Sequence, residues 1–308
     1  MTSKIIGVQG DNLNKINIST DTSIFLAHEG QNLGYKLFYY TPSELSIVKN
    51  KILANGVFIK LSYKSKKFYK IYKKQKIDIT RLKFILIRQD PPFNSEYLTT
   101  TLILDNLKKT KVINNPIAIR NVSEKLYSKY FMKYMPDTIF SNNIDEVKKF
   151  FNKNKQIIMK PINGYGGNQI YLIQNKFNKK LITNFLEKNG HSMFQKFLKN
   201  ISKGDKRVFI INGKVCGAIS RVPKKGSYLS NMSKGALPKL TNLTNKEMKI
   251  SKIIGKKLKK DNIYFAGIDF IDQQLNGDIN VTSPTGLKTY YDLSKINLAK
   301  IFWKGLKA

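Results

Sequence analysis

The sequence contains Ala266-Gly-Ile-Asp-Phe-Ile271 and, shortly after it, Gly277-Asp-Ile-Asn-Val-Thr282. Both stretches are rich in β-branched and aromatic residues, a composition typical of strands. Asn276-Gly277, which lies between them, is a frequent hairpin turn. We therefore expect an antiparallel hairpin over residues 264–282, and its polar residues indicate what it binds.

Three polar residues of this hairpin, Asp269, Asp278 and Asn280, are expected on one face. Residues two apart on a strand point the same way. If the turn is centred near residues 274–275, Asp269 lies opposite Asn280. Two carboxylates and an amide oxygen are hard ligands, which Mg²⁺ takes together with substrate phosphates. The alternative is an ordinary solvated sheet face.

The rest of the chain divides into three predicted units. The first, residues 1–122, alternates strands with helices, which predicts a parallel sheet covered by helices on both faces. The second, residues 123–200, is a small α+β unit, and the third, residues 201–308, is mostly antiparallel. The strands are expected at 4–8, 35–40, 50–75 (a hairpin), 84–88, 111–114, 138–140, 156–160, 169–173, 192–196, 207–212 and 214–221. The helices are expected at 21–32, 95–108, 123–132, 144–154, 178–189 and 244–260, and a long loop at 224–236.

Composition and charge narrow the class of protein. The chain has 308 residues and one cysteine, Cys216, and its apolar runs are too short for a signal peptide or a membrane span. We expect a cytoplasmic protein without a membrane partner. The net charge of +35 raises nucleic-acid binding as an alternative. The basic residues are scattered and almost all Lys, whereas base and phosphate recognition favours Arg, so we expect no specific nucleic-acid partner.

A glycine-rich turn and two arginines suggest phosphate chemistry. Glycines at 164–167 allow backbone N–H groups to approach a phosphate, and Lys160 precedes them at the end of a strand. Arg207 and Arg221 lie on the two strands of one predicted hairpin, where they could stabilise a transferring phosphoryl group. A purely structural turn and ordinary surface ion pairs are the alternatives. The two histidines, His28 and His191, lack the neighbours that a metal site or catalytic triad needs.

A set of motifs, in order and spacing, resembles the prokaryotic glutathione synthetases, and the similarity runs from about residue 4 to about residue 293. These motifs are Arg88-Gln-Asp-Pro-Pro-Phe93, Ser123-Glu-Lys-Leu-Tyr127, Met159-Lys-Pro161 with Gly164-Tyr-Gly-Gly167, Gly204-Asp-Lys-Arg207, Ala266-Gly-Ile-Asp269 and Ile279-Asn-Val-Thr-Ser-Pro-Thr285. The resemblance implies an α/β protein with the ATP-grasp fold. An N-terminal Rossmann-like domain would precede two lobes that clamp ATP.

The resemblance also implies a reaction and a set of site residues. ATP would activate the carboxylate of γ-glutamylcysteine as an acyl phosphate, which glycine would attack to give glutathione. Mg²⁺, or Mn²⁺, would assist, and the protein would be a homotetramer. The implied ATP-binding residues are Lys125, Lys160, Gly164, Gly166, Gly167, Gln195, Phe197, Leu198 and Asp205, and the implied metal ligands are Asp269, Asp278 and Asn280. Arg207 and Arg221 are the implied catalytic residues, and Arg88, Asp90, Asn231, Ser283 and Thr285 the implied substrate-binding ones.

Some positions depart from the family's pattern. The second metal carboxylate is usually Glu and is here Asp278, and Leu229 stands where an Arg is expected. The stretch after Thr285 is usually acidic and here reads Gly286-Leu-Lys-Thr-Tyr-Tyr291. These changes keep two alternatives open. One is an ATP-grasp ligase with different substrates, and the other is a nucleotide-binding paralogue with impaired catalysis.

Overall fold

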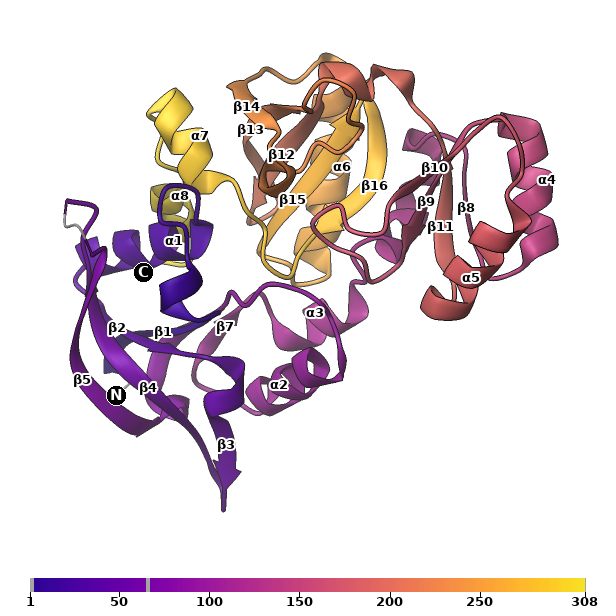
Figure 1. Ribbon diagram of the computed structural model, residues 1–308. Coiled ribbons are helices and arrows are strands. Elements are labelled where there is room, and N and C mark those ends of the chain that lie inside the picture. Colours follow the sequence, from indigo (N-terminus) through magenta and orange to yellow (C-terminus); the bar gives the residue numbers. More distant parts are fainter. Residues whose placement is uncertain (1–2, 65–66, 308) are drawn as a thin grey trace.

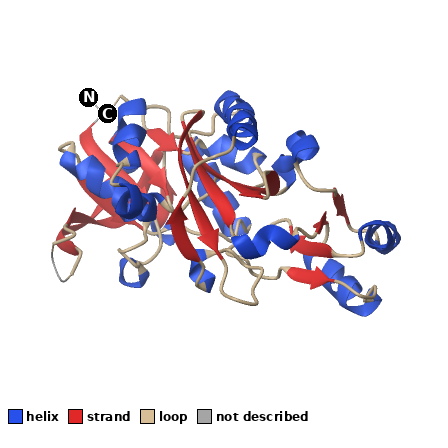
Figure 2. Cartoon of the chain, turned by 90° about the horizontal axis from the view of Figure 1, so that it is seen from above, coloured by secondary structure: helices blue, strands red, loops and turns tan. Residues whose placement is uncertain are grey.

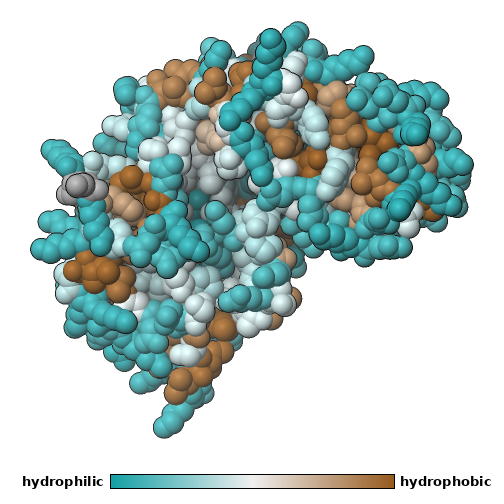
Figure 3. Space-filling model, in the orientation of Figure 1, coloured by the Kyte–Doolittle hydropathy of each residue, from teal (hydrophilic) through white to brown (hydrophobic). Residues whose placement is uncertain are grey.

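The computed structural model describes residues 3–64 and 67–307 and contains three sheets. The first sheet and its helices form one end of the molecule, and the small second sheet forms the other (Figure 1). The third sheet lies between them (Figure 1). Hydrophilic residues cover most of the face shown in Figure 3.

The first sheet has the strand order β3-β4-β2-β1-β6-β7, with β5 paired to β4. Its parallel part confirms the alternation read from the sequence, because helices pack on both faces (Figure 2). The parallel strands are β1 (Ser3–Gln9), β2 (Lys36–Tyr40), β6 (Leu82–Ile87) and β7 (Lys111–Ile113), and the antiparallel ones are β3 (Leu45–Val48), β4 (Lys51–Leu61) and β5 (Tyr69–Asp78). The helices are α1 (Thr22–Asn32), α2 (Ser95–Asp105) and α3 (Pro116–Asn121), of which α3 was not predicted.

The second sheet has the order β10-β9-β11-β8, and two helices pack against it. Its strands are β8 (Thr138–Ser141), β9 (Ile157–Pro161), β10 (Tyr171–Ile173) and β11 (Ser192–Lys196), and its helices are α4 (Ile144–Asn154) and α5 (Lys179–Asn189). Each of these elements confirms a prediction, although β10 starts two residues later than expected. The amphipathic pattern of both helices explains why they could be predicted.

The helix predicted at 123–132 forms only in part, as the 3-10 helix η4 (Leu126–Tyr134), which has a kink at Phe131. An α-helix would use the Glu124 carbonyl to accept a bond from the backbone four residues on. Here that carbonyl accepts from Ile279 N–H at 3.0 Å, and Ser128 N–H bonds to Lys125 O at 3.0 Å instead. The contact with the third sheet therefore overrides the local helical pattern.

The third sheet has the order β14-β13-β12-β15-β16, with α6 (Asn245–Lys260) packed against it. Its strands are β12 (Asp205–Ile211), β13 (Lys214–Val222), β14 (Leu237–Leu240), β15 (Phe265–Ile271) and β16 (Gln274–Asn280). The β12–β13 hairpin turns at Asn212-Gly213, as predicted, and both residues have positive φ. A capping box between Thr244 and Glu247 begins α6.

The β15–β16 hairpin forms, but its predicted turn is wrong. The chain turns at Asp272-Gln273, whose φ angles are 50° and 60°, and Asn276-Gly277 lies inside β16. The register shifts between Ile268 and Phe270, so Asn280 pairs with Gly267 and not with Asp269. A tight two-residue loop at Asp272 leaves Asn276 free for contacts outside the hairpin.

Two further helices, α7 (Leu287–Ser294) and α8 (Leu298–Gly305), were not predicted. Trp303 on α8 is fully buried in one core cluster with Ile6 and Phe84 of the first sheet. Its indole N–H donates to Leu26 O at 2.8 Å. The C-terminal helices therefore pack on the N-terminal unit, beside α1 (Figure 1).

Candidate active site

A cavity of about 870 Å³ lies between the second and third sheets. All the residues predicted to bind ATP or metal or to act in catalysis line it, together with Asn231. They are Lys125, Lys160, Gly164, Gly166, Gly167, Gln195, Phe197, Leu198, Asp205, Arg207, Arg221, Asn231, Asp269, Asp278 and Asn280.

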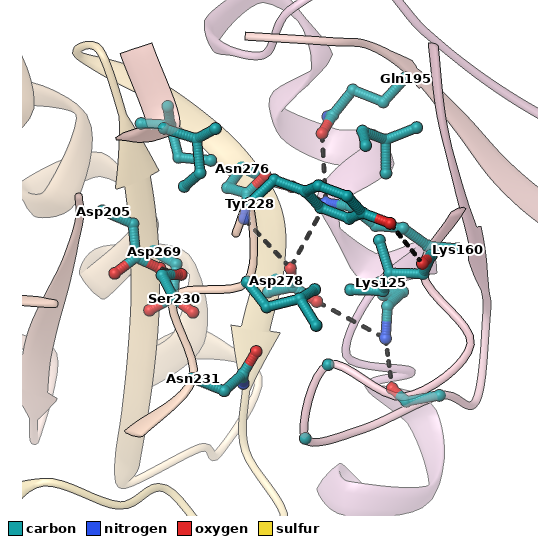
Figure 4. A pocket seen from close by; sticks show the side chains of 18 of the residues that line it. Lys125, Lys160, Gln195, Asp205, Tyr228, Ser230, Asn231, Asp269, Asn276 and Asp278 are labelled. Carbon is teal, nitrogen blue, oxygen red and sulfur yellow. Dashed lines mark hydrogen bonds and ion pairs between the residues drawn. The ribbon is translucent and has the colours of Figure 1, made fainter. Parts of the chain in front are cut away.

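Two buried lysines converge on Asp278 in this cavity (Figure 4). Lys125 Nζ lies 3.5 Å from one carboxylate oxygen, and Lys160 Nζ lies 3.6 Å from the other. Lys160 also donates to Gln195 Oε1 at 3.2 Å, and to the carbonyl and side-chain oxygens of Asn276 at 3.0 Å each. Burial lowers the pKa of Lys160, and the neighbouring Asp278 opposes that shift. Both ammonium groups could therefore exchange the Asp278 carboxylate for a more strongly anionic group.

Two arginines hold two further carboxylates of the cavity, those of Asp205 and Asp269. Arg207 forms a bidentate pair with Asp269 at 2.5 and 2.8 Å. Arg221 lies 2.9 Å from Asp269 and forms a second bidentate pair with Asp205, whose Nε–Oδ1 distance is 2.8 Å. Burial alone would raise the pKa of Asp269, but the two guanidinium groups outweigh it and hold that pKa at about 2. Burial dominates at Asp205 and raises its pKa.

The loop after β13, residues 223–236, lies against the glycine turn; we call it the lid. Tyr228 O–H donates to Ile170 O at 3.3 Å, and Ser230 Oγ donates to Asp205 at 2.5 Å. At Gly167, where φ is +75°, a Cβ atom would come within 2.4 Å of Asn231 Oδ1. A side chain at position 167 would therefore strain the backbone and displace the side chain of Asn231.

The chemistry of the donor set fits a magnesium ion. Asp269, Asp278 and Asn280 line the same cavity despite the shifted register. Asn280 Nδ2 donates to Gly267 O at 3.3 Å, which leaves its side-chain oxygen available as a ligand. The described residues contain no cluster of three or more His, Cys, Asp or Glu side chains that could hold a metal ion. A metal ion bound there would compete with the cationic side chains for both carboxylates.

Comparison with known proteins assigns the chain to a family. The model of the prokaryotic glutathione synthetase N-terminal domain matches residues 5–120, and that of the family's ATP-grasp domain matches residues 124–295. The chain belongs to the prokaryotic glutathione synthetase family. Glutathione synthetase of Mesorhizobium japonicum is 35% identical over 98% of this chain and 97% of its own length. That of Buchnera aphidicola is 34% identical over 92% of both chains.

Solved structures agree on the fold. D-cycloserine synthetase has a TM-score of 0.67 at 12% identity, with 98% of both chains covered. D-alanyl-alanine synthetase A from Vibrio cholerae has a TM-score of 0.60 at 14% identity, covering 100% of this chain and 98% of its own. The predicted ATP-grasp fold is confirmed. As a glutathione synthetase family member, the chain is an ATP-dependent carboxylate–amine ligase.

Four predicted substrate residues of this family member lie outside the main cavity. Arg88 is buried and donates to Ser23 Oγ and Pro284 O, both at 3.0 Å. Ser283 Oγ donates to Arg88 O at 3.2 Å, and Asp90 is hydrogen-bonded to Ser283. Thr285, two residues after Ser283, is exposed to solvent. The hydrogen bonds of Arg88 and Ser283 thus tie the end of β6 to the stretch after β16.

Several cavity residues were missed in the sequence. Asn276 was interpreted as a turn residue, and Tyr228 and Ser230 fall in a stretch expected to be a mobile loop. Glu124 also lines the cavity, between Ser123 and Lys125 of a recognised motif. Only Glu124 carried a sequence signal, namely its place in that motif.

No helix in residues 3–64 and 67–307 combines the length and apolarity needed to cross a membrane.

Proposed function

We propose that this chain joins γ-glutamylcysteine to glycine at the expense of ATP and forms glutathione through an acyl phosphate. The observation that carries the proposal is the convergence of two buried ammonium groups on Asp278, within the cavity that Arg207 and Arg221 also line. Family membership supports the choice of substrates.

Lys125 and Lys160 would bind the nucleotide phosphates. Their ammonium groups are buried and fixed by neighbouring oxygens, so little side-chain entropy is lost when a phosphate replaces Asp278. Gly164, Gly166 and Gly167 would bring backbone N–H groups to the same phosphates. Gln195, Phe197, Leu198 and Asp205 would complete the nucleotide site, with the adenine near the first three.

The residues that would hold Mg²⁺ are Asp269, Asp278 and Asn280. When bound, the ion neutralises phosphate charge and polarises the transferred phosphoryl group. The chain's part is to align the donor carboxylate with that group and to keep water out. The lid, which already contacts the glycine turn through Asn231, would provide the exclusion of water.

Arg207 and Arg221 would stabilise the negative charge of the transferring phosphoryl group and of the acyl phosphate. Their bidentate pairs with Asp269 and Asp205 fix both guanidinium groups before substrate arrives. Such preorganised cations lower the transition-state free energy without reorganisation during the reaction. Asn231 of the lid, together with Arg88, Asp90, Ser283 and Thr285, would contact the amino-acid substrates or position the groups that do.

Several finer points belong to the same proposal. We assign residues 1–122, 123–200 and 201–308 to a substrate domain, the small ATP-grasp lobe and the large lobe. The protein would work in the cytoplasm as a homotetramer, with Mn²⁺ able to replace Mg²⁺. We expect no specific nucleic-acid partner, and salt-dependent retention on DNA compared with another polyanion checks this.

The test is release of ADP by the purified protein with ATP, Mg²⁺, γ-glutamylcysteine and glycine, with each component omitted in turn. The proposal predicts that release requires all four and yields a product with the mass of glutathione. Tight ATP binding without release would contradict it and favour an impaired paralogue. Release with other amino-acid pairs would instead indicate changed substrates.

A further inference from the structure

A second cavity of about 690 Å³ adjoins the first. Its wall includes Pro91 and Phe93 after β6, Arg120 near the end of α3, and Thr282 after β16. Glu124, Gly164 and Tyr165 line both cavities. A molecule in the second cavity therefore lies next to the glycine turn, where the proposed function places the nucleotide phosphates.

Arg120 on this wall is only half paired. Its Nη2 lies 2.6 Å from Asp105 Oδ2, and the side chain is 16% exposed. Its Nη1 is buried and has no hydrogen-bond partner among the described residues, and the same is true of Ser123 Oγ. Leaving a buried charged donor unpaired costs more than leaving a neutral one. Both residues line the second cavity, so a ligand bound there could supply the acceptor that the two buried atoms lack.

Glu124 adds a complementary charge to the same wall. Its Oε1 accepts three hydrogen bonds, from Val281 N, Thr282 N and Thr282 Oγ1, at 2.9, 3.1 and 2.7 Å. In the described part of the chain, no hydrogen bond reaches its Oε2. The wall thus offers a guanidinium and a hydroxyl for a carboxylate, and a carboxylate oxygen for an ammonium group. This combination matches the zwitterionic head of an amino acid.

We propose that Arg120 determines donor specificity by binding, in the second cavity, the glutamyl α-carboxylate of γ-glutamylcysteine. The inference rests on the proposed function and deepens it. The reacting carboxylate must lie beside the phosphates in the first cavity, so the carboxylate at Arg120 is the one that does not react. Glu124 Oε2 would accept a hydrogen bond from the adjacent α-ammonium group. Glycine also carries a carboxylate, and the experiment separates the two sources.

The experiment compares Arg120→Met, Arg120→Lys and the matched control Asp105→Asn. The control removes the charge that pairs with Arg120 but keeps the guanidinium. For Arg120→Met we expect the KM for γ-glutamylcysteine to rise at least about tenfold, with kcat and the KM values for ATP and glycine within about twofold. Arg120→Lys should recover part of the loss. Asp105→Asn should change the donor KM by less than about threefold.

A second substrate makes the test specific to one carboxylate. The analogue 4-aminobutyrylcysteine lacks the glutamyl α-carboxylate. For the wild type, the KM for the analogue should exceed the KM for γ-glutamylcysteine. The factor should be about the same as the one by which Arg120→Met raises the KM for γ-glutamylcysteine. Arg120→Met should show no further loss with the analogue, because the interaction is already absent.

Several outcomes would overturn the inference. The first two are an unchanged KM for γ-glutamylcysteine in Arg120→Met and an equal rise of that KM in Asp105→Asn. The other two are a rise in KM for glycine alone and a further rise in KM when Arg120→Met is given the analogue. Circular dichroism and ATP affinity check that each variant is folded. Failure of the proposed function is distinct, because wild type would then not turn over γ-glutamylcysteine at all.

Discussion

Lys160 Nζ lies 3.6 Å from Asp278 Oδ2, so a carboxylate proposed to hold a metal ion is paired with a buried ammonium group. Lys125 occupies the other oxygen at 3.5 Å. Asp269 is likewise held by Arg207 and Arg221. We therefore expect metal and nucleotide binding to be coupled, because phosphates bound by the lysines would free Asp278.

The first prediction concerns metal binding without nucleotide. Nucleotide-free protein should bind Mn²⁺ weakly, and Lys160→Met should bind it at least about fivefold more tightly, since the competing cation is gone. Titration followed by electron paramagnetic resonance measures the affinity. Lys196→Met, which removes a charge that lines the cavity but is not paired with Asp278, is the control. Equal Mn²⁺ affinities for wild type and Lys160→Met would contradict the coupling.

The second prediction concerns the buried pair around Asp269. The pKa of Asp269 in the folded protein is about 2, below the ordinary value of 3.8 for an aspartate side chain. Its contribution to stability is therefore complete above pH 4 and is lost as the pH falls toward 2. Asp269→Asn should lower the free energy of unfolding by about 3–5 kcal/mol at pH 7, because two buried guanidinium groups lose a partner. The difference from wild type should shrink between pH 4 and 2 in urea unfolding. A difference independent of pH over that range would be inconsistent with this assignment.

The third prediction concerns the lid. Ser230→Ala removes the bond to Asp205, worth about 1 kcal/mol, which corresponds to about fivefold more frequent local opening. Trypsin should then cleave after Lys224 or Lys225 about fivefold faster, and ATP with Mg²⁺ should protect the site. Ser227→Ala is the control, because among the described residues Ser227 Oγ accepts a hydrogen bond from Leu229 N–H, which lies within the lid. Equal cleavage rates for the two variants would show that the Asp205 contact does not hold the lid.

The fourth prediction uses two glycines with the same backbone requirement. Gly167 and Gly226 have φ angles of +75° and +82°. A Cβ atom added at Gly167 would meet Asn231, whereas a Cβ atom added at Gly226 would have no neighbouring atom within 4 Å. Either Ala variant should cost about 1 kcal/mol of strain. Gly167→Ala should in addition raise the KM for ATP about tenfold or more. If both variants raise that KM alike, the close contact between turn and lid has no role in nucleotide binding.

The periodic parts of the fold could be predicted from the sequence, and the non-local parts could not. The β12–β13 turn at Asn212-Gly213 is set by local chemistry, and so it was found. Asn276-Gly277 carries the same signal, yet Asn276 bonds to Lys160 from a distant strand while Asp272 makes the turn. Trp303 gave no local sign that it completes the core of the first sheet.

The candidate site divides in the same way. Charged residues inside recognised motifs, such as Lys125 and Asp269, could be assigned to one cavity before its shape was known. Tyr228 and Ser230 lie in a stretch without periodicity, and their place depends on how the lid folds over the glycine turn. Arg120 stands out only through the pairing of its two terminal nitrogens, which a sequence does not reveal.

In the proposed reaction, a carboxylate of the donor attacks ATP and leaves its oxygen on phosphate. The most direct measurement uses γ-glutamylcysteine labelled with ¹⁸O in the cysteinyl carboxylate, together with ATP, Mg²⁺ and glycine, and mass analysis of the products. We predict that the released phosphate carries one ¹⁸O atom for each glutathione formed. Phosphate without label, or ADP release that does not depend on both amino-acid substrates, would contradict an acyl-phosphate ligase.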